Sequence, residues 1–212
     1  MEKNITGYTK QEDIANTITH GIGLFIGLIA VSYLIYKSVI IGSFLHLVSY
    51  TVYGASLLAI YFASTVYHFV QSDIKKLKWQ KVDLVCIYFY IAGSYTPFML
   101  LNLKGAVGLK VLAAVWCIAL FGTFYKLKVK NPNSFISLIS YFAMGWFIVT
   151  AWNPFVKSIS TEVLNFIKIG GFFYCLGVVF YLFDRMKYNH AIWHLFVMAG
   201  SACHFYAIMI AS

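Results

Sequence analysis

Seven long apolar runs dominate the sequence and limit what the chain can fold into. They cover roughly residues 20–41, 44–68, 82–101, 106–125, 135–152, 164–183 and 193–212. A helix of about 20 apolar residues crosses the hydrocarbon core of a bilayer. The runs alternate too little for membrane β-strands, and lipid requires every backbone group to be satisfied within the span. The sequence therefore predicts an all-α integral membrane protein, a bundle of seven transmembrane helices.

The composition agrees with a membrane protein. Of the 212 residues, 61% are hydrophobic and 11% are charged, with a mean hydropathy of +0.77. A soluble domain has about 45–50% apolar and about 25% charged residues. The connections are short, so we expect one membrane domain over residues 1–212, with a polar N-terminal segment at about 1–16. Residues 1–19 lack the apolar core of a cleavable signal peptide, so we expect insertion to depend on the first helix.

The distribution of positive charge predicts the orientation. The net charge of +9 would suggest nucleic acid for a soluble protein, but here the lysines lie between apolar runs, which favours contact with anionic membrane lipids and no nucleic-acid partner. Eleven Lys and Arg residues fall on the side of the N-terminus and five on the other. Because positive charge accumulates in the cytoplasm, we expect a multi-pass protein of the bacterial cell membrane with the N-terminus cytoplasmic and the C-terminus outside.

Polar residues gather at the predicted cytoplasmic ends of the runs. Ionisable groups at membrane depth usually pair, bind ions or take part in chemistry, although one or two are explained simply because helix ends tolerate them. Here they come from four different runs and share one level, which favours a common site over the alternative that "NHAIWH" is an interfacial anchor. The residues are His20, His68, Asp83, His190 and His194, with Ser64 one turn deeper than His68.

The three histidines His68, His190 and His194 have the chemistry of a zinc site. Residues four apart on a helix share a face, so His190 and His194 can bind one ion, and His68 adds a third nitrogen. Three neutral imidazoles leave a position open for water, as in catalytic zinc sites, although iron, copper and nickel also accept imidazole. We expect Asp83 to act as a base and Ser64 to orient a ligand or donate to an oxyanion.

Other polar residues have plainer interpretations. Glu12, Asn16 and His20 follow one another at four-residue spacing, which predicts a stripe that closes the inner mouth of the bundle or simply caps the first helix. His204 lies about 15 Å deeper than His194, where we expect a hydrogen bond to a neighbouring helix.

Pro97 should kink the third helix, and the scattered glycines should allow close helix packing. The four cysteines show no CxxC spacing, so we expect no disulfide and no cysteine metal site.

These motifs together resemble a known family. The stretches "EDIANTITHGIG", "STVYHF", "KVDLVCIYFYIAGSYTPF", "GGFFYCLGVVFY" and "NHAIWHLFVMAGSACHF" are similar to the bacterial hemolysin III family, within the progestin and adipoQ receptor superfamily. The resemblance implies seven helices with a cytoplasmic N-terminus. It also implies zinc bound by His68, His190 and His194, with Asp83 near the zinc-bound water. Eukaryotic relatives are linked to ceramide hydrolysis, and the long extra N-terminal domain of the adiponectin receptors is missing here.

Three functions follow as expectations. The first is a zinc-dependent hydrolase that attacks an amide in a lipid entering sideways from the bilayer, in the manner of a ceramidase. The second is a pore or cytolysin, as the family name suggests, although the outer halves of the runs are overwhelmingly apolar. The third is a receptor or regulator of the membrane state in which zinc holds the helices together. A cavity that leads from the metal to the lipid would favour the hydrolase.

Overall fold

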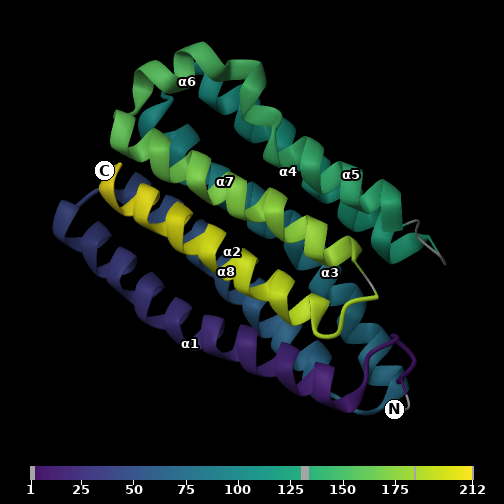
Figure 1. Ribbon diagram of the computed structural model, residues 1–212. Coiled ribbons are helices and arrows are strands. Elements are labelled where there is room, and N and C mark those ends of the chain that lie inside the picture. Colours follow the sequence, from purple (N-terminus) through teal and green to yellow (C-terminus); the bar gives the residue numbers. More distant parts are fainter. Residues whose placement is uncertain (1–2, 130–133, 184, 212) are drawn as a thin grey trace.

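The computed structural model describes residues 3–129, 134–183 and 185–211, and helices make up most of this part of the chain (Figure 1). Seven stretches are long and apolar enough to cross a membrane, which confirms the predicted all-α fold of a multi-pass membrane protein. The helices are α1 (Lys10–Ile41), α2 (Phe44–Phe69), α3 (Asp73–Pro97), η1 (Phe98–Asn102), α4 (Ala106–Lys128), α5 (Ser134–Gly145), η2 (Phe147–Ala151), α6 (Trp152–Ser158), α7 (Thr161–Leu182) and α8 (Asn189–Ile210).

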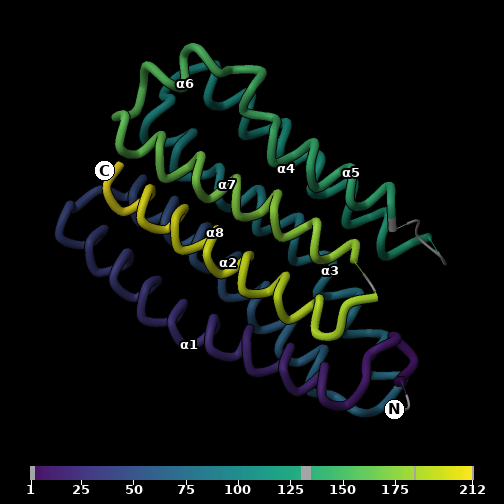
Figure 2. The backbone as a smooth tube through the Cα atoms, in the orientation of Figure 1, coloured from purple at the N-terminus to yellow at the C-terminus, as the bar shows by residue number. Residues whose placement is uncertain are grey.

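The helices α2 and α3 form the centre of the bundle. Within an apolar stretch of 18 residues in each of these two spans, 56% of the residues are buried inside the protein. The corresponding share is 17–33% in the other five spans. Going around the bundle, α7 packs on α8, α8 on α1, α1 on α2, α2 on α3, and α3 on α4, while α5 packs on α3 and α4 (Figure 2). The N-terminus lies at the end of the bundle where α7 connects to α8, and we call this end the N-side face.

Several helices begin earlier than hydropathy predicts. The structure starts α1 at Lys10, so the polar segment predicted at residues 1–16 is helical over its second half. Thr9 caps this helix: its side chain accepts from the Glu12 N–H while Glu12 accepts from the Thr9 N–H, which satisfies two of the free donors at the helix start. The first turns of α3 and α8 likewise lie in segments predicted to be loops, because polar turns that extend beyond the lipid carry no hydropathy signal.

Two predictions about helix regularity were incomplete. Instead of a simple kink at Pro97, α3 continues into the π-helical turn η1, in which the Leu103 N–H donates to the Phe98 carbonyl at 2.8 Å. Pro97 has no backbone N–H, so α3 lacks one hydrogen bond in the turn directly before η1. The run predicted as a single helix over 135–152 is divided near Trp146, and the segment predicted as the loop "NPFVKSISTEV" contains α6.

Large apolar side chains cover much of the outer surface. Phe25 on α1 and Phe121 on α4 expose 66% and 76% of their surface, and many neighbouring side chains are similarly open. In water such a surface would cause association, but acyl chains of lipid are as apolar as these residues. The exposed belt is therefore the expected surface of a protein that is embedded in a bilayer.

Candidate metal centre

Three histidines meet at the N-side face. His68 lies in the last turn of α2, and His190 and His194 lie in the first turns of α8. One ring nitrogen from each lies within 4.8 Å of the others, so the three could hold a metal ion. His68 and His194 are fully buried, with 0% and 1% of their surface exposed, and His190 is half-buried. The structure thus brings together the three residues that the sequence analysis assigned to zinc.

The partners of His68 leave one of its nitrogens available to a metal. Nδ1 lies 3.0 Å from Oδ1 of Asp13, and a carboxylate can only accept, so Nδ1 carries the proton. Nδ2 of the Asn16 side-chain amide also lies 3.3 Å from this nitrogen, and the Asn16 side-chain oxygen is buried without a partner among the described residues. Nε2 of His68 is buried and has no hydrogen bond within the described chain. An orphaned buried lone pair at this position fits a metal ligand.

His194 is oriented in the same way. Its Nδ1 lies 3.0 Å from the hydroxyl of Thr19, and that hydroxyl donates to the carbonyls of Ala15 and Asn16, both at 3.0 Å. The hydroxyl therefore accepts from Nδ1–H of His194, which puts the ring's lone pair on Nε2. Both rings take their tautomer from residues in the first turns of α1, a helix that supplies none of the three ligands.

Asp13 also forms a buried ion pair. Its Oδ2 lies 2.8 Å from Nζ of Lys76, and the two residues expose only 2% and 1% of their surface. The same Nζ donates to the carbonyls of Tyr67, His68 and Val70 at 3.3–3.4 Å, so it also satisfies the end of α2. Lys76 was counted with the lysines that face lipid head groups, and the structure corrects this because its charge is inside the protein.

The two residues expected to do chemistry lie next to each other. The Asp83 side chain in α3 faces the Ser64 hydroxyl in α2. This hydroxyl is buried and has no hydrogen bond of normal geometry among the described residues. The Asp83 carboxylate is also within electrostatic range of the phenols of Tyr8 and Tyr181. The rings of these tyrosines lie 5.2 Å and 5.9 Å from that of His190, which places Asp83 on the same side of the bundle as the histidines.

The predicted stripe of Glu12, Asn16 and His20 is only partly assembled. Asn16 and His20 point into the site, where His20 stacks on His194 with ring centres 3.5 Å apart. Glu12 instead caps α1 and accepts from the Tyr188 N–H at 3.3 Å, so it connects α1 to the segment before α8. The inward acidic residue is Asp13, which the sequence analysis missed. His204 donates to the Ile167 carbonyl of α7 at 3.3 Å, as predicted.

Tyr8 covers the site from outside the bundle. It precedes α1, and its ring lies 5.4 Å from that of His68 and 5.2 Å from that of His190. Burial raises the pKa of its phenol well above the usual value, so the hydroxyl stays protonated. Nothing in the sequence indicated this residue, because a segment outside the predicted spans carries no periodicity from which a contact can be inferred.

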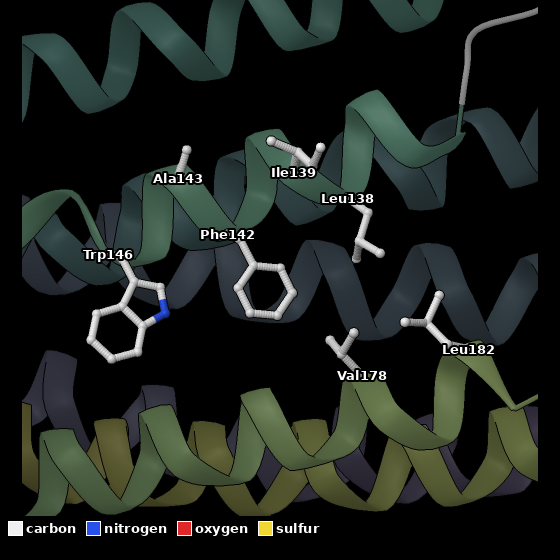
Figure 3. Close-up of a pocket in the computed structure, with 7 residues that line it drawn as sticks. All are labelled: Leu138, Ile139, Phe142, Ala143, Trp146, Val178 and Leu182. Atoms are coloured by element: carbon white, nitrogen blue, oxygen red, sulfur yellow. The ribbon is translucent and has the colours of Figure 1, made fainter.

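An apolar groove opens to the lipid between α5 and α7 (Figure 3). Its volume is about 530 Å³, and it is lined by Leu138, Ile139, Phe142, Ala143, Trp146, Val178 and Leu182. Leu182, at the end of α7 near the N-side face, directly follows Tyr181, whose ring lies against His190. One end of the groove therefore lies close in sequence to a residue that contacts the histidine cluster.

Comparison with known proteins agrees with this architecture. The family model described as "Haemolysin-III related" matches residues 8–205. The chain belongs to the hemolysin III family. It is 37% identical to the hemolysin-3 homolog of Bacillus subtilis (strain 168), over 95% of both chains, and 35% identical to hemolysin-3 of Bacillus cereus, over 99% of this chain and 96% of that protein.

A human protein also matches the hemolysin III chain. The monocyte to macrophage differentiation factor of Homo sapiens is 35% identical over 74% of this chain and 67% of its own length. The resemblance to the hemolysin III family and its superfamily that the motifs suggested is therefore confirmed. The names of these relatives mention neither a metal nor a substrate.

Proposed function

We propose that this hemolysin III chain is a zinc-dependent membrane hydrolase that cleaves an amide bond in a lipid. The main support is the meeting of His68, His190 and His194 at one end of the bundle, with Asp83 and Ser64 on the same side. Three neutral imidazoles with an open fourth position are typical of catalytic zinc, whereas structural sites close with four protein ligands. The unpartnered Nε2 atom of His68 fits this role.

A zinc ion held by these histidines supplies Lewis acidity toward the substrate carbonyl. Hydrolysis adds water across the C–N bond, so one proton must leave the water and one must reach the departing amine. Asp83 is our candidate to accept the first proton and pass it to the amine, because a carboxylate can serve as base and then as acid. Ser64 has a buried hydroxyl without a normal hydrogen bond, and we assign it to stabilise the developing oxyanion.

The surroundings favour a lipid substrate. The groove between α5 and α7 is apolar and open to the bilayer, and its volume lies within the range of ligand sites. An acyl chain in this groove would need no passage through water, and the Leu182 end of the groove is next in sequence to Tyr181, whose ring lies against His190. Such a groove would let a lipid substrate enter sideways from the bilayer, as a lipid hydrolase requires.

The first test is metal content, measured by mass spectrometry on protein purified in detergent without chelators. We expect about one zinc per chain in the wild type. The variants His68→Ala and His190→Ala should lose it, while His46→Ala, which changes a histidine outside the cluster, should retain it. A wild type without metal contradicts the proposed mechanism.

The second test is turnover of lipid amides in mixed micelles by the zinc-loaded protein. Asp83→Asn should keep its zinc but lose hydrolysis about 100-fold or more, because it removes the proton acceptor without removing a ligand. Asp73→Asn, at an exposed aspartate at the start of α3, is the matched control. Bound zinc with no turnover of any lipid amide would exclude the hydrolase.

Bound zinc without turnover of lipid amides would support a second function, a membrane regulator in which the metal only joins helices. One observation favours it: the cluster connects α2 to α8, and its partners come from α1, so a bound ion would tie three helices together. In that case chelation lowers the thermal stability of the bundle although no substrate is consumed.

A further inference from the structure

Residues 3–9 fold into a compact hook before α1, which we call the N-terminal hook. Lys3 and Thr9 form an antiparallel bridge, so the two ends of the segment lie side by side. The side-chain oxygen Oδ1 of Asn4 accepts three hydrogen bonds. They come from the Thr6 N–H at 2.9 Å, the Thr6 hydroxyl at 2.8 Å and the Tyr8 N–H at 3.3 Å. One side chain therefore holds the hook in shape.

The same side chain attaches the hook to the metal centre. The Asn4 amide donates to Oδ2 of Asp13, the oxygen that also receives Lys76. The other oxygen of Asp13 holds Nδ1 of His68. A continuous chain of hydrogen bonds thus runs from Asn4 through Asp13 to the ring of His68.

Tyr8 gives the hook a second contact with the site. Its ring meets His68 nearly edge-on, at an interplanar angle of 67°, and lies tilted by 49° against His190. Two of the three proposed ligands are therefore covered by a residue that belongs to neither α2 nor α8. This contact lies on the N-side face of the bundle.

Capping of α1 does not account for these contacts. Thr9 and Glu12 already form a complete capping box, which satisfies the start of the helix without Asn4 or Tyr8. Instead, the Asn4 amide donates to Asp13, and the Tyr8 ring packs against His68 and His190. Such contacts are what one expects of residues that surround the ligands of a metal and fix their orientation.

We propose that the N-terminal hook is part of the metal centre, with Asn4 and Tyr8 as positioning residues that orient His68 and His190 and restrict exchange of the metal at the N-side face. This inference rests on the metal site of the proposed function and is independent of whether the protein hydrolyses lipids. It also requires the reverse effect, since linkage is reciprocal: bound metal must stabilise the hook.

The experiment measures the rate at which zinc-loaded, full-length protein in detergent releases zinc to an excess of a fluorescent chelator. Tyr8→Ala and Asn4→Ala should release zinc at least about tenfold faster than the wild type, the lower end of the effect seen when ligand-supporting residues are changed. Tyr8→Phe should behave like the wild type, because it keeps the ring. Tyr36→Ala and Asn165→Ala, at exposed sites on α1 and α7, are the matched controls.

A second readout follows the hook itself. Trypsin cleavage after Lys3 or Lys10 in the wild type should be several-fold faster once zinc is removed, and Asn4→Ala should abolish that difference. Wild-type release rates in both Tyr8→Ala and Asn4→Ala, or cleavage that is indifferent to zinc, would overturn this proposal while the metal site stands. A wild type that binds no zinc would overturn both.

Discussion

Asp13 holds a lysine, a histidine and an asparagine at once, in a protein with only seven acidic residues. A buried carboxylate without partners would be costly, so its three contacts indicate a position where the charge is needed. Its effect on His68 is to fix the proton on Nδ1 and to make Nε2 a better donor to a metal. Asp13 is thus a residue that would influence a metal in the candidate centre through His68.

We expect Asp13→Asn to weaken zinc binding about 10- to 100-fold, because a neutral amide holds Nδ1–H less strongly and leaves Lys76 without its counter-charge. Competition with a chelator of known affinity measures this change. Asp73→Asn, which removes an exposed carboxylate at the same end of the bundle, should bind zinc as the wild type does. Equal affinities in both variants would show that the Asp13 contact has no effect on the metal.

At the residue scale, depth within the spans was enough to group the three histidines with Asp83 and Ser64. Of the two interpretations of Glu12, the structure shows helix capping, and geometry explains why Asp13 rather than Glu12 faces inward. A helix turns about 100° per residue, so Asp13 lies about 20° from His20 around the axis, whereas Glu12 lies about 80° away. Spacing of seven residues predicts a common face better than spacing of eight. The contact of Tyr8 arises from a segment that folds back, and no periodicity predicts it.

At the element scale, the central packing of α2 and α3 depends on a glycine. A Cβ built on Gly93 would lie 2.1 Å from the Ser56 hydroxyl and 2.8 Å from the Ser56 Cβ. The helices that carry His68 and Asp83 approach closely here because Gly93 has no side chain and so leaves room for that of Ser56. This confirms the role in packing that the sequence analysis gave to the glycines.

Gly93→Ala should therefore destabilise the bundle by about 1–3 kcal/mol, the usual cost of overpacking. Gly171→Ala is the matched control, because nothing lies within 4 Å of a Cβ at that position of α7, and it should be neutral or stabilising. Adding Ser56→Gly should restore part of the loss. Unfolding in mixed micelles measures all three, and equal stability of the two alanine variants would refute close packing as the reason for Gly93.

The boundaries of the elements were less predictable than their number. Hydropathy locates the part of a helix that lies in lipid, so it found seven spans but missed the polar first turns of α1, α3 and α8. Those turns carry Asp13 and Lys76, which explains why the ion pair was not foreseen. The π turn after Pro97 depends on how one missing hydrogen bond is accommodated, and this is decided by packing rather than by local sequence.

At the scale of the whole molecule, the polar groups and the positive charges share one face. Two of the eleven basic residues on this face, Lys76 and Lys126, are buried with 1% and 2% exposure, so they do not reach lipid head groups. By sequence, nine of the eleven remain on this side, counting Lys130, which lies outside the described residues, against five on the other. The excess of basic residues on the N-side face is therefore smaller than the sequence count suggests, but this face still carries more of them. The candidate metal centre lies on this more positive face.

Because positive charge is retained in the cytoplasm, we expect the N-side face to be cytoplasmic and the C-terminus to lie outside. A C-terminal fusion to alkaline phosphatase should then be active, and a fusion to green fluorescent protein should be dark; the opposite pattern would contradict this orientation.

Whether the positive charges determine the orientation can be tested separately. Lys75, Lys78 and Lys81 lie in the first turns of α3 and are not buried in the bundle. Changing all three to glutamine leaves six basic residues against five, so this variant should insert in both orientations and give both signals.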